Sequence, residues 1–310
     1  MLSPMLLGLV LIALAAISWG TTGATMTLLA RDAAAGPLLV GWSRLAIAAP
    51  ILVLGAAAVS RLGPRRPTRR AWPAPSDLPL CAALGLAMAA YQVFYFRAVT
   101  LTGVAAAALL AICSAPLIIA VLAALFLGER LTPVVRLSLG MAVAGTALLV
   151  VGPRGLGEIT GHFGLGALLA LGAGVSYAVY AVAAKGLLAR VQPVAVSALT
   201  FALAALFLAP ALLGEPTPAH ALRSGWPLLL YLGLVPTAVA YAMFTTGLHR
   251  VPATVAGIVS LLEPLTATTL GLLVFGEHLG ALGITGALLL LAALGLLALR
   301  TPAAAGRGGG

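Results

Sequence analysis

Long apolar runs, separated by short polar stretches, make up almost the whole chain. Each run is continuous and roughly 20 residues long, the length that a helix needs to cross the ~30 Å core of a bilayer. Continuous runs favour helices over barrel strands, in which apolar residues alternate with polar ones. The pattern predicts ten transmembrane helices, over residues 5–30, 37–59, 77–98, 104–127, 133–152, 164–188, 193–213, 226–247, 253–275 and 280–299.

One stretch of the sequence occurs twice, at residues 104–131 and again at 252–279. Each copy is an apolar run with a proline near its middle, Pro116 or Pro264, and a Gly-Glu dipeptide at its end. A repeat of this length indicates a chain built from two similar units. The expected organisation is a five-helix unit at 1–152, a connection at 153–163, a second five-helix unit at 164–299 and a disordered tail at 300–310.

Basic residues are distributed unevenly between the predicted helices. With the N-terminus in the cytoplasm, the cytoplasmic connections hold Arg61, Arg65, Arg66, Arg69, Arg70, Arg130, Arg136, Lys185, Arg190, Arg250, Arg300 and Arg307. The outer connections hold only Arg31, Arg97, Arg154 and Arg223. The positive-inside rule favours this orientation, with both termini in the cytoplasm.

Five helices per unit is an odd number, so the second unit must enter the membrane from the opposite side to the first. The two repeats are therefore predicted to be inverted. Inverted repeats are the architecture of alternating-access transporters, whose substrate site lies near the middle of the membrane between the units.

Composition agrees with a membrane protein, since 62% of residues are hydrophobic, 8% are charged and the mean hydropathy is +1.15. The net charge of +10 resides in the connections, where membrane topology explains it without a nucleic-acid partner.

Cys81 and Cys113 fall inside predicted helices and are expected to be packing residues. No phosphate-binding loop, cofactor motif or metal spacing occurs, and the four histidines lie in or beside connections, so an intramembrane enzyme is disfavoured.

The paired motifs resemble a known family. They are Ser114-Ala115-Pro116 with Gly128-Glu129-Arg130-Leu131, and Leu262-Glu263-Pro264 with Gly276-Glu277-His278-Leu279, together with Trp19-Gly20 and Arg44 in the first two helices. This pattern is similar to the repeat unit of the drug/metabolite transporter superfamily, in its ten-helix exporter branch. The resemblance implies export of small metabolites, often amino acids, across the bacterial inner membrane.

Two charged residues inside predicted helices are candidates for the transport site. A carboxylate near the middle of a membrane is costly, so Glu263 is expected either to bind a substrate ammonium, to carry a coupling proton, or to bond backbone freed beside Pro264. Arg44 suits a substrate carboxylate. Alternatively, Arg44 pairs with Glu263, Asp32 or helix-terminal carbonyls, or extends to the membrane surface.

Aromatic and amide side chains supply further candidates for a cavity wall. They are Trp19, Tyr91, Gln92, Tyr95, Tyr177, Tyr180 and Tyr241. Such a wall could hold an apolar side chain while its polar tips bind an amino-acid backbone; the alternative is ordinary packing. Overlay of the two units aligns Trp19 with Tyr177, so these rings are expected to face each other. Pro116 and Pro264 are expected to be hinges or fixed kinks.

The sequence therefore predicts a secondary transporter, able to work as a monomer, that exports small amphipathic metabolites by alternating access. Amino acids, including aromatic ones, are the leading substrate class. The alternatives are a passive channel for small solutes and a multidrug exporter. No cofactor or metal is expected.

Overall fold

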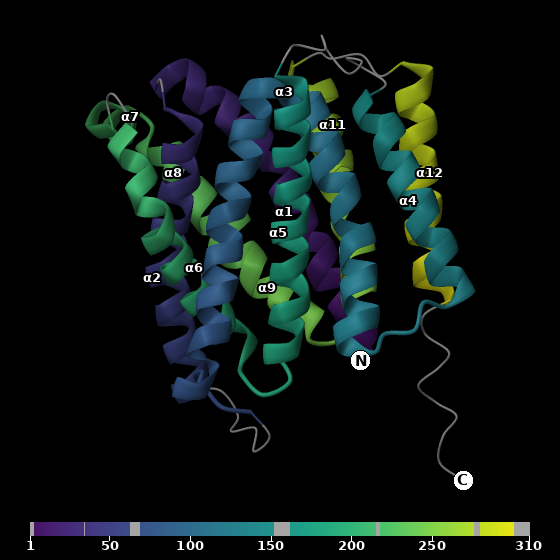
Figure 1. Ribbon diagram of the computed structural model, residues 1–310, viewed down its shortest axis with the longest axis horizontal. Coiled ribbons are helices and arrows are strands. Elements are labelled where there is room, and N and C mark those ends of the chain that lie inside the picture. Colours follow the sequence, from purple (N-terminus) through teal and green to yellow (C-terminus); the bar gives the residue numbers. More distant parts are fainter. Residues whose placement is uncertain are drawn as a thin grey trace.

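The computed structural model describes residues 3–33, 35–62, 69–151, 162–214, 218–275 and 280–300. The long helices run side by side from one end of the molecule to the other (Figure 1). The first part of the chain forms α1 (Pro4–Ala33), α2 (Pro37–Leu62), the short η1 (Pro75–Asp77), α3 (Leu78–Leu127) and α4 (Pro133–Val151). The second part forms α5 (Phe163–Leu187), α6 (Pro193–Leu208), η2 (Ala209–Gly214), α7 (Pro218–Ser224), α8 (Trp226–Gly233), η3 (Leu234–Val239), α9 (Ala240–Leu248), α10 (Ala253–Ser260), α11 (Leu262–Phe275) and α12 (Ala281–Arg300).

The predicted fold class, an all-α membrane protein, is confirmed. Within the described ranges, nine helical stretches are long and apolar enough to span a membrane, and Pro133–Leu149 is a shorter apolar helix. These ten stretches coincide with the ten predicted spans. The predicted connection at 153–163 and the tail at 300–310 lie largely outside the described residues, so the unit boundaries stay predictions.

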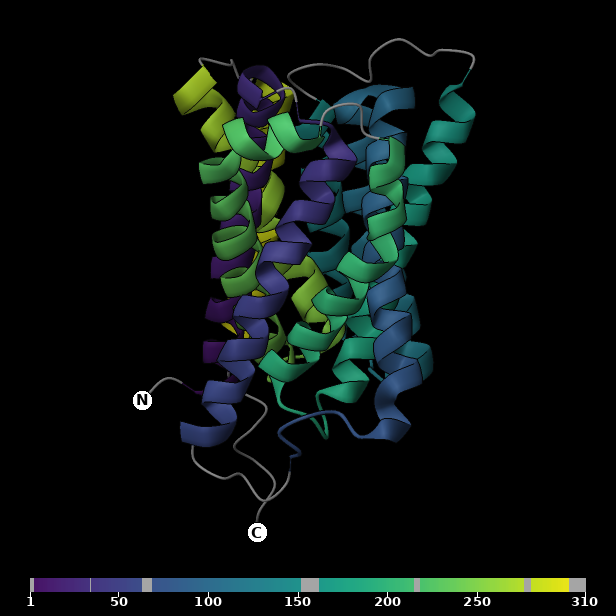
Figure 2. The same ribbon diagram turned by 90° about the vertical axis from the view of Figure 1, so that its left-hand side faces the viewer.

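Several spans differ from simple straight helices. The predicted third and fourth helices form α3, whose two limbs meet at Gly103; its φ of +80° suits glycine, which has no Cβ to clash. The eighth span is built from α8, the π-helical η3 and α9. The predicted polar connection before it contains α7, which begins at a proline and lies across the end of the bundle (Figure 2).

The helices pack in a pattern that the pseudo-two-fold relation of inverted repeats explains. In the second half, α5 packs along both limbs of α3 from the first half. In the first half, α1 packs along α9, α10 and α11 from the second half. Two further pairs join equivalent helices, α2 with α6 and α4 with α12. We call α3 and α5 the α5 group, and α1, α9, α10 and α11 the α1 group.

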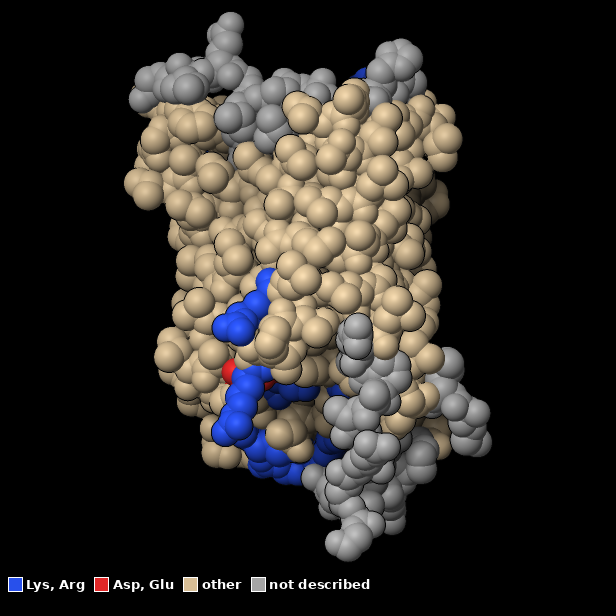
Figure 3. All heavy atoms as spheres, turned by 90° about the vertical axis from the view of Figure 1, so that its right-hand side faces the viewer, with Lys and Arg blue, Asp and Glu red and all other residues tan. Residues whose placement is uncertain are grey.

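Basic residues gather at the end of the bundle where α1 begins. We call this the basic end; it carries Arg61, Arg69, Arg70, Arg130, Arg136, Lys185, Arg190 and Arg250. On the face formed by α4 and α12, Figure 3 shows most basic atoms near this lower end, with a broad surface lacking charge above them. A wide apolar band with charge at its edge is the surface that a bilayer requires.

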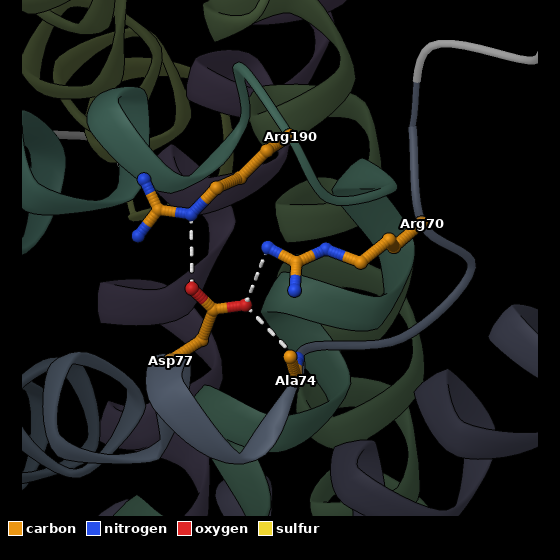
Figure 4. Close-up of polar contacts among 4 residues, drawn as sticks. All are labelled: Arg70, Ala74, Asp77 and Arg190. Carbon is orange, nitrogen blue, oxygen red and sulfur yellow. Dashed lines mark hydrogen bonds and ion pairs between the residues drawn. The ribbon is translucent and has the colours of Figure 1, made fainter.

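A buried carboxylate ties two connections together at the basic end (Figure 4). Asp77 is 2% exposed, and its carboxylate accepts hydrogen bonds from the Arg190 Nε at 2.9 Å and the Ala74 backbone N–H at 2.9 Å. Its second oxygen also lies 3.1 Å from Arg70 Nη2. The backbone of Arg70 bonds to that of Arg190 and Gln192, so the segment before α3 is fastened to the segment after α5.

Two glycines allow α4 and α12 to approach closely. A Cβ added to Gly145 would lie 2.7 Å from the Leu290 nitrogen and 2.8 Å from the Gly286 oxygen. A Cβ added to Gly286 would lie 2.5 Å from the Gly145 oxygen. Small residues at such contacts let membrane helices pack backbone against backbone.

The first prediction concerns this contact. Gly145→Val and Gly286→Val should each separate α4 from α12 and cost about 1–3 kcal/mol, as overpacking does elsewhere. The measurement is the thermal unfolding midpoint of purified protein in detergent. Gly140→Val in α4 and Gly295→Val in α12 are matched controls, because no atom lies within 4 Å of an added Cβ there. Equal midpoints for all four variants would contradict the packing.

A second prediction compares two acidic residues. Asp77→Asn should lower the unfolding midpoint by a few degrees, because Asp77 is buried and joins two arginines. Asp32→Asn should have little effect, because the pair of Asp32 with Arg31 is largely exposed at 51% and 70% of the side chains. The same detergent melting experiment tests both, and a larger effect at Asp32 would refute the assignment.

Candidate functional site

A cavity lies between the two helix groups. It encloses about 420 Å³ of empty space, counted out to its open mouth. The α5 group contributes one wall, and α10 and α11 from the α1 group contribute the other. Its lining residues are Tyr91, Ala111, Ile112, Ala115, Pro116, Ile119, Tyr177, Gly257, Ser260, Leu261 and Glu263.

Glu263 lies on the cavity where the ninth span is broken. Pro264 has no N–H to donate to the Ser260 carbonyl, four residues earlier. Helix α10 ends at Ser260. Leu261 forms a turn, and α11 restarts at Leu262, so Glu263 occupies the first turn of the new helix. The partial positive charge at a helix N-terminus favours a carboxylate at this position. Within the described residues, no hydrogen bond or close ion pair holds the Glu263 carboxylate.

The first copy of the repeat meets the second at the same cavity. Pro116 leaves the Ile112 carbonyl without its usual helical donor, and both residues line the cavity. Opposite them, a Cβ added to Gly257 would lie 3.5 Å from the Pro116 Cα. Pro116 does not interrupt α3, whereas α10 and α11 are separate helices. The two copies therefore face each other but differ in backbone continuity.

Aromatic rings surround the inner side of the cavity. Tyr91 stacks on Tyr95 with ring centroids 5.9 Å apart and lies 6.0 Å from Tyr177. Tyr177 in turn meets Trp19 edge to face at 6.4 Å. The ring of Trp19 also lies 4.9 Å from that of Tyr241. One connected aromatic cluster thus joins α1, α3, α5 and α9.

Two polar atoms in this cluster have no hydrogen-bond partner among the described residues. They are the buried Trp19 Nε1 and the buried hydroxyl oxygen of Tyr180. Trp19 is 5% exposed and Tyr180 is 0% exposed. Unsatisfied buried polar groups are uncommon in folded proteins and call for an explanation, such as a bound molecule or water.

Arg44 lies in the interior, on the side of α2 that faces η3. Its Nε donates a 3.0 Å hydrogen bond to the Thr237 hydroxyl, which donates at 2.7 Å to the Leu232 carbonyl. No described carboxylate lies within ion-pair distance of Arg44, and Asp32 pairs with Arg31 instead. The expected close pairs of Arg44 with Glu263 and Asp32 are therefore not formed among the described residues.

Of the nine predicted binding residues, Tyr91, Tyr177 and Glu263 line the cavity. Trp19, Tyr95, Tyr180 and Tyr241 belong to the aromatic cluster behind it. Gln92 is 3% exposed, and its amide approaches Gly41 of α2, so it does not contribute to the cavity lining. Tyr91 and Tyr95 share a helix face because they are four residues apart, while Gln92 points about 100° away.

Sequence reasoning missed small and apolar lining residues and one polar partner. Gly257, Ser260 and Ala111 line the cavity but carry no distinctive chemistry. Their position in the two repeat copies was a usable signal, because copies related by a pseudo-two-fold axis meet at that axis. Thr237 could not be found this way, because its place depends on the π-helical geometry of η3.

Inverted five-helix repeats with an inward carboxylate beside a broken helix are characteristic of membrane transport proteins. The described residues contain no group of three or more His, Cys, Asp or Glu placed to hold a metal ion. The fold and the cavity thus define a polytopic membrane transporter.

Comparisons with known proteins identify the family. The EamA-like transporter family matches the chain twice, over residues 6–151 and 164–299. The chain belongs to this family, which is part of the drug/metabolite transporter superfamily, and it is a transporter and not an enzyme. The predicted family is confirmed.

Individual relatives agree with this assignment. The chain is 35% identical to the uncharacterized transporter YwfM of Bacillus subtilis, over 92% of this chain and 90% of the relative. It is 32% identical to a probable terminal-alkyne amino-acid exporter of Streptantibioticus cattleyicolor, over 80% and 82%. It is 33% identical to the aromatic amino acid exporter YddG of Ancylobacter novellus, over 64% and 69%. One solved crystal structure matches with a TM-score of 0.76 and 26% identity, over 93% of this chain and 96% of the other.

Proposed function

We propose that this transporter exports amino acids, including aromatic ones, across the bacterial inner membrane by alternating access between its inverted repeats. The observation that carries the proposal is the cavity at which an unpaired carboxylate, Glu263, adjoins the rings of Tyr91 and Tyr177. A carboxylate suits a substrate ammonium, and aromatic rings suit an apolar or aromatic side chain. Two relatives that are named as amino-acid exporters support the same substrate class.

The remaining polar groups extend this recognition. The Trp19 Nε1, which has no partner among the described residues, is a donor suited to a substrate carboxylate. Arg44 carries its positive charge in the interior beside Thr237 and makes no close ion pair with Glu263 among the described residues. An amino acid carries an ammonium and a carboxylate, so it offers one charged group to Glu263 and the other to the Trp19 donor. A monomer is proposed to suffice for this, because both walls of the cavity come from the two halves of one chain.

Both termini are proposed to lie in the cytoplasm. The support is the concentration of basic residues at the basic end, where α1 begins and α12 ends, since cytoplasmic connections are enriched in Lys and Arg. Export then moves substrate from the basic end toward the end that carries α7.

A third prediction tests the substrate class. Purified protein in proteoliposomes should take up labelled phenylalanine, leucine or alanine in a saturable way, and unlabelled substrate inside should accelerate uptake by exchange. Exchange separates a carrier from a passive channel. Glu263→Gln should insert normally yet transport about tenfold more slowly or worse, because a hydrogen bond to a charged group contributes ~1.5–3 kcal/mol.

The matched control is Asp32→Asn, which removes an exposed acid outside the cavity and should transport at the normal rate. A normal rate for Glu263→Gln would remove Glu263 from the mechanism. Absence of uptake for every amino acid tested would reject amino acids as substrates, while lipophilic drugs in the same assay would reveal a multidrug exporter. A rate that responds to an imposed pH gradient only when Glu263 is present would assign it a coupling proton.

A fourth prediction tests the orientation. In a version without Cys81 and Cys113, Ser60→Cys at the basic end should resist an impermeant maleimide added to intact cells. Ser224→Cys, at the exposed end of α7, should react. Both should react after permeabilisation. The reverse pattern would overturn the proposed orientation.

A further inference from the structure

The turn between α9 and α10 is held from two sides by residues of the other helix group. This turn runs from His249 to Pro252 at the basic end. On one side, the Lys185 ammonium of α5 donates to the carbonyl oxygens of Leu248 at 2.7 Å, His249 at 3.3 Å and Val251 at 2.6 Å. These are acceptors left without helical donors where α9 ends, and a cation is favoured there.

On the other side, Glu129 binds the start of α10. Its carboxylate accepts hydrogen bonds from the Ala253 N–H at 2.5 Å, the Thr254 N–H at 3.1 Å and the Thr254 hydroxyl at 2.9 Å. The N-cap residue of α10 is Pro252, whose side chain has no oxygen to accept these amides. Glu129, which is distant in the sequence, therefore supplies the N-terminal cap of α10.

The Gly-Glu dipeptide explains how Glu129 reaches this position. Gly128 ends α3 in the left-handed region, at φ +66°, which favours glycine. The chain turns there, and Glu129 leaves the helix axis toward α10 instead of continuing along α3. Glu129 therefore caps a helix of the opposite group.

Both contacts cross the boundary that also contains the cavity. Lys185 lies in α5, and Glu129 follows the end of α3, so both contacts come from the α5 group. The turn joins two helices of the α1 group. Thr254 is six residues before Ser260 of the cavity lining, about 9 Å along one short helix. The two charges therefore close the basic end of the same interface, one or two helical turns below the cavity.

The opposite end lacks an equivalent lysine. The overlay that aligns Trp19 with Tyr177 also aligns Thr27 with Lys185. The Thr27 hydroxyl donates to the Gly23 carbonyl of its own helix at 3.1 Å, so it holds no neighbouring helix through that bond. This lysine contact is thus a feature of the basic end and not a consequence of the repeat.

We propose that Glu129 and Lys185 form the latch of the cytoplasmic gate, and that the cavity opens to the cytoplasm when they release the turn between α9 and α10. The proposal rests on the alternating-access carrier and the orientation proposed above, but its test needs no substrate. Both are positioning residues, because they act on the helices that carry the cavity and do not line it.

The fifth prediction uses a single cysteine as a reporter. Ser260→Cys is placed in the cavity of a version without Cys81 and Cys113, and its rate of reaction with an impermeant maleimide is measured in inside-out and right-side-out membrane vesicles. Glu129→Gln and Lys185→Met should each raise the rate from the cytoplasmic face by about tenfold, because each removes charge-assisted hydrogen bonds. Thr254→Val, which removes one donor and leaves both charges, should give a smaller rise in the same direction.

Thr27→Val is the matched control and should leave the cytoplasmic rate unchanged. Unchanged cytoplasmic rates in Glu129→Gln and Lys185→Met would overturn the proposal, as would a rise confined to the outer face. If the charge variants fail to insert, Thr254→Val alone decides, and no rise there counts against the latch. Because labelling uses no amino acid, failure of the transport assay and failure of the latch are distinguishable.

Discussion

Inside a bilayer, every backbone amide and carbonyl has to find its hydrogen-bond partner within the protein, because lipid tails offer none. A helix can therefore be interrupted only where other protein groups replace the missing bonds. The break before α11 shows the consequence, since the Leu261 N–H bonds to the Ile258 carbonyl and the turn lies against the interior. In η3, the Thr237 hydroxyl likewise donates a hydrogen bond to the Leu232 carbonyl. The cavity and the break before α11 occur together because both need a protein-lined interior.

The inverted repeat gives the two halves a common scaffold, and the chemistry lies where they differ. Glu263 has Ala115 as its counterpart, so a charge adjoins the cavity from one group only. Lys185 has Thr27 as its counterpart, so at this pair of positions the cation bonds to the other helix group and the hydroxyl bonds within its own helix. In a perfectly symmetric carrier, the inward-open and outward-open states would have the same free energy. Asymmetric side chains on a symmetric backbone are a simple way to bias one state over the other.

Much of the fold could be predicted because lipid leaves few alternatives to long helices. The length of the apolar runs predicted the ten spans. The odd number of helices per unit predicted that the two repeats are inverted. The positions where helices are interrupted could be predicted only in part. Pro264 indicates the break before α11, whereas the π-helical geometry of η3 has no comparable signal in the sequence. Arg44 and Thr237 are 193 positions apart, and only three-dimensional packing brings them together. Glu129 could be assigned to a helix end from its Gly-Glu setting, but not to the particular helix that it caps.

A closure made from helix caps suits a gate at the edge of the membrane. Lys185 and Glu129 together make six hydrogen bonds to the turn between α9 and α10 and to the start of α10. If the turn moved away within lipid, each freed group would remain unsatisfied at a cost of several kcal/mol. At the basic end, water can replace each bond, and the net contribution of one such bond falls to ~0.5–3 kcal/mol. The same contacts that align two helix groups can therefore be exchanged for water one bond at a time, which mid-membrane contacts of this kind could not be.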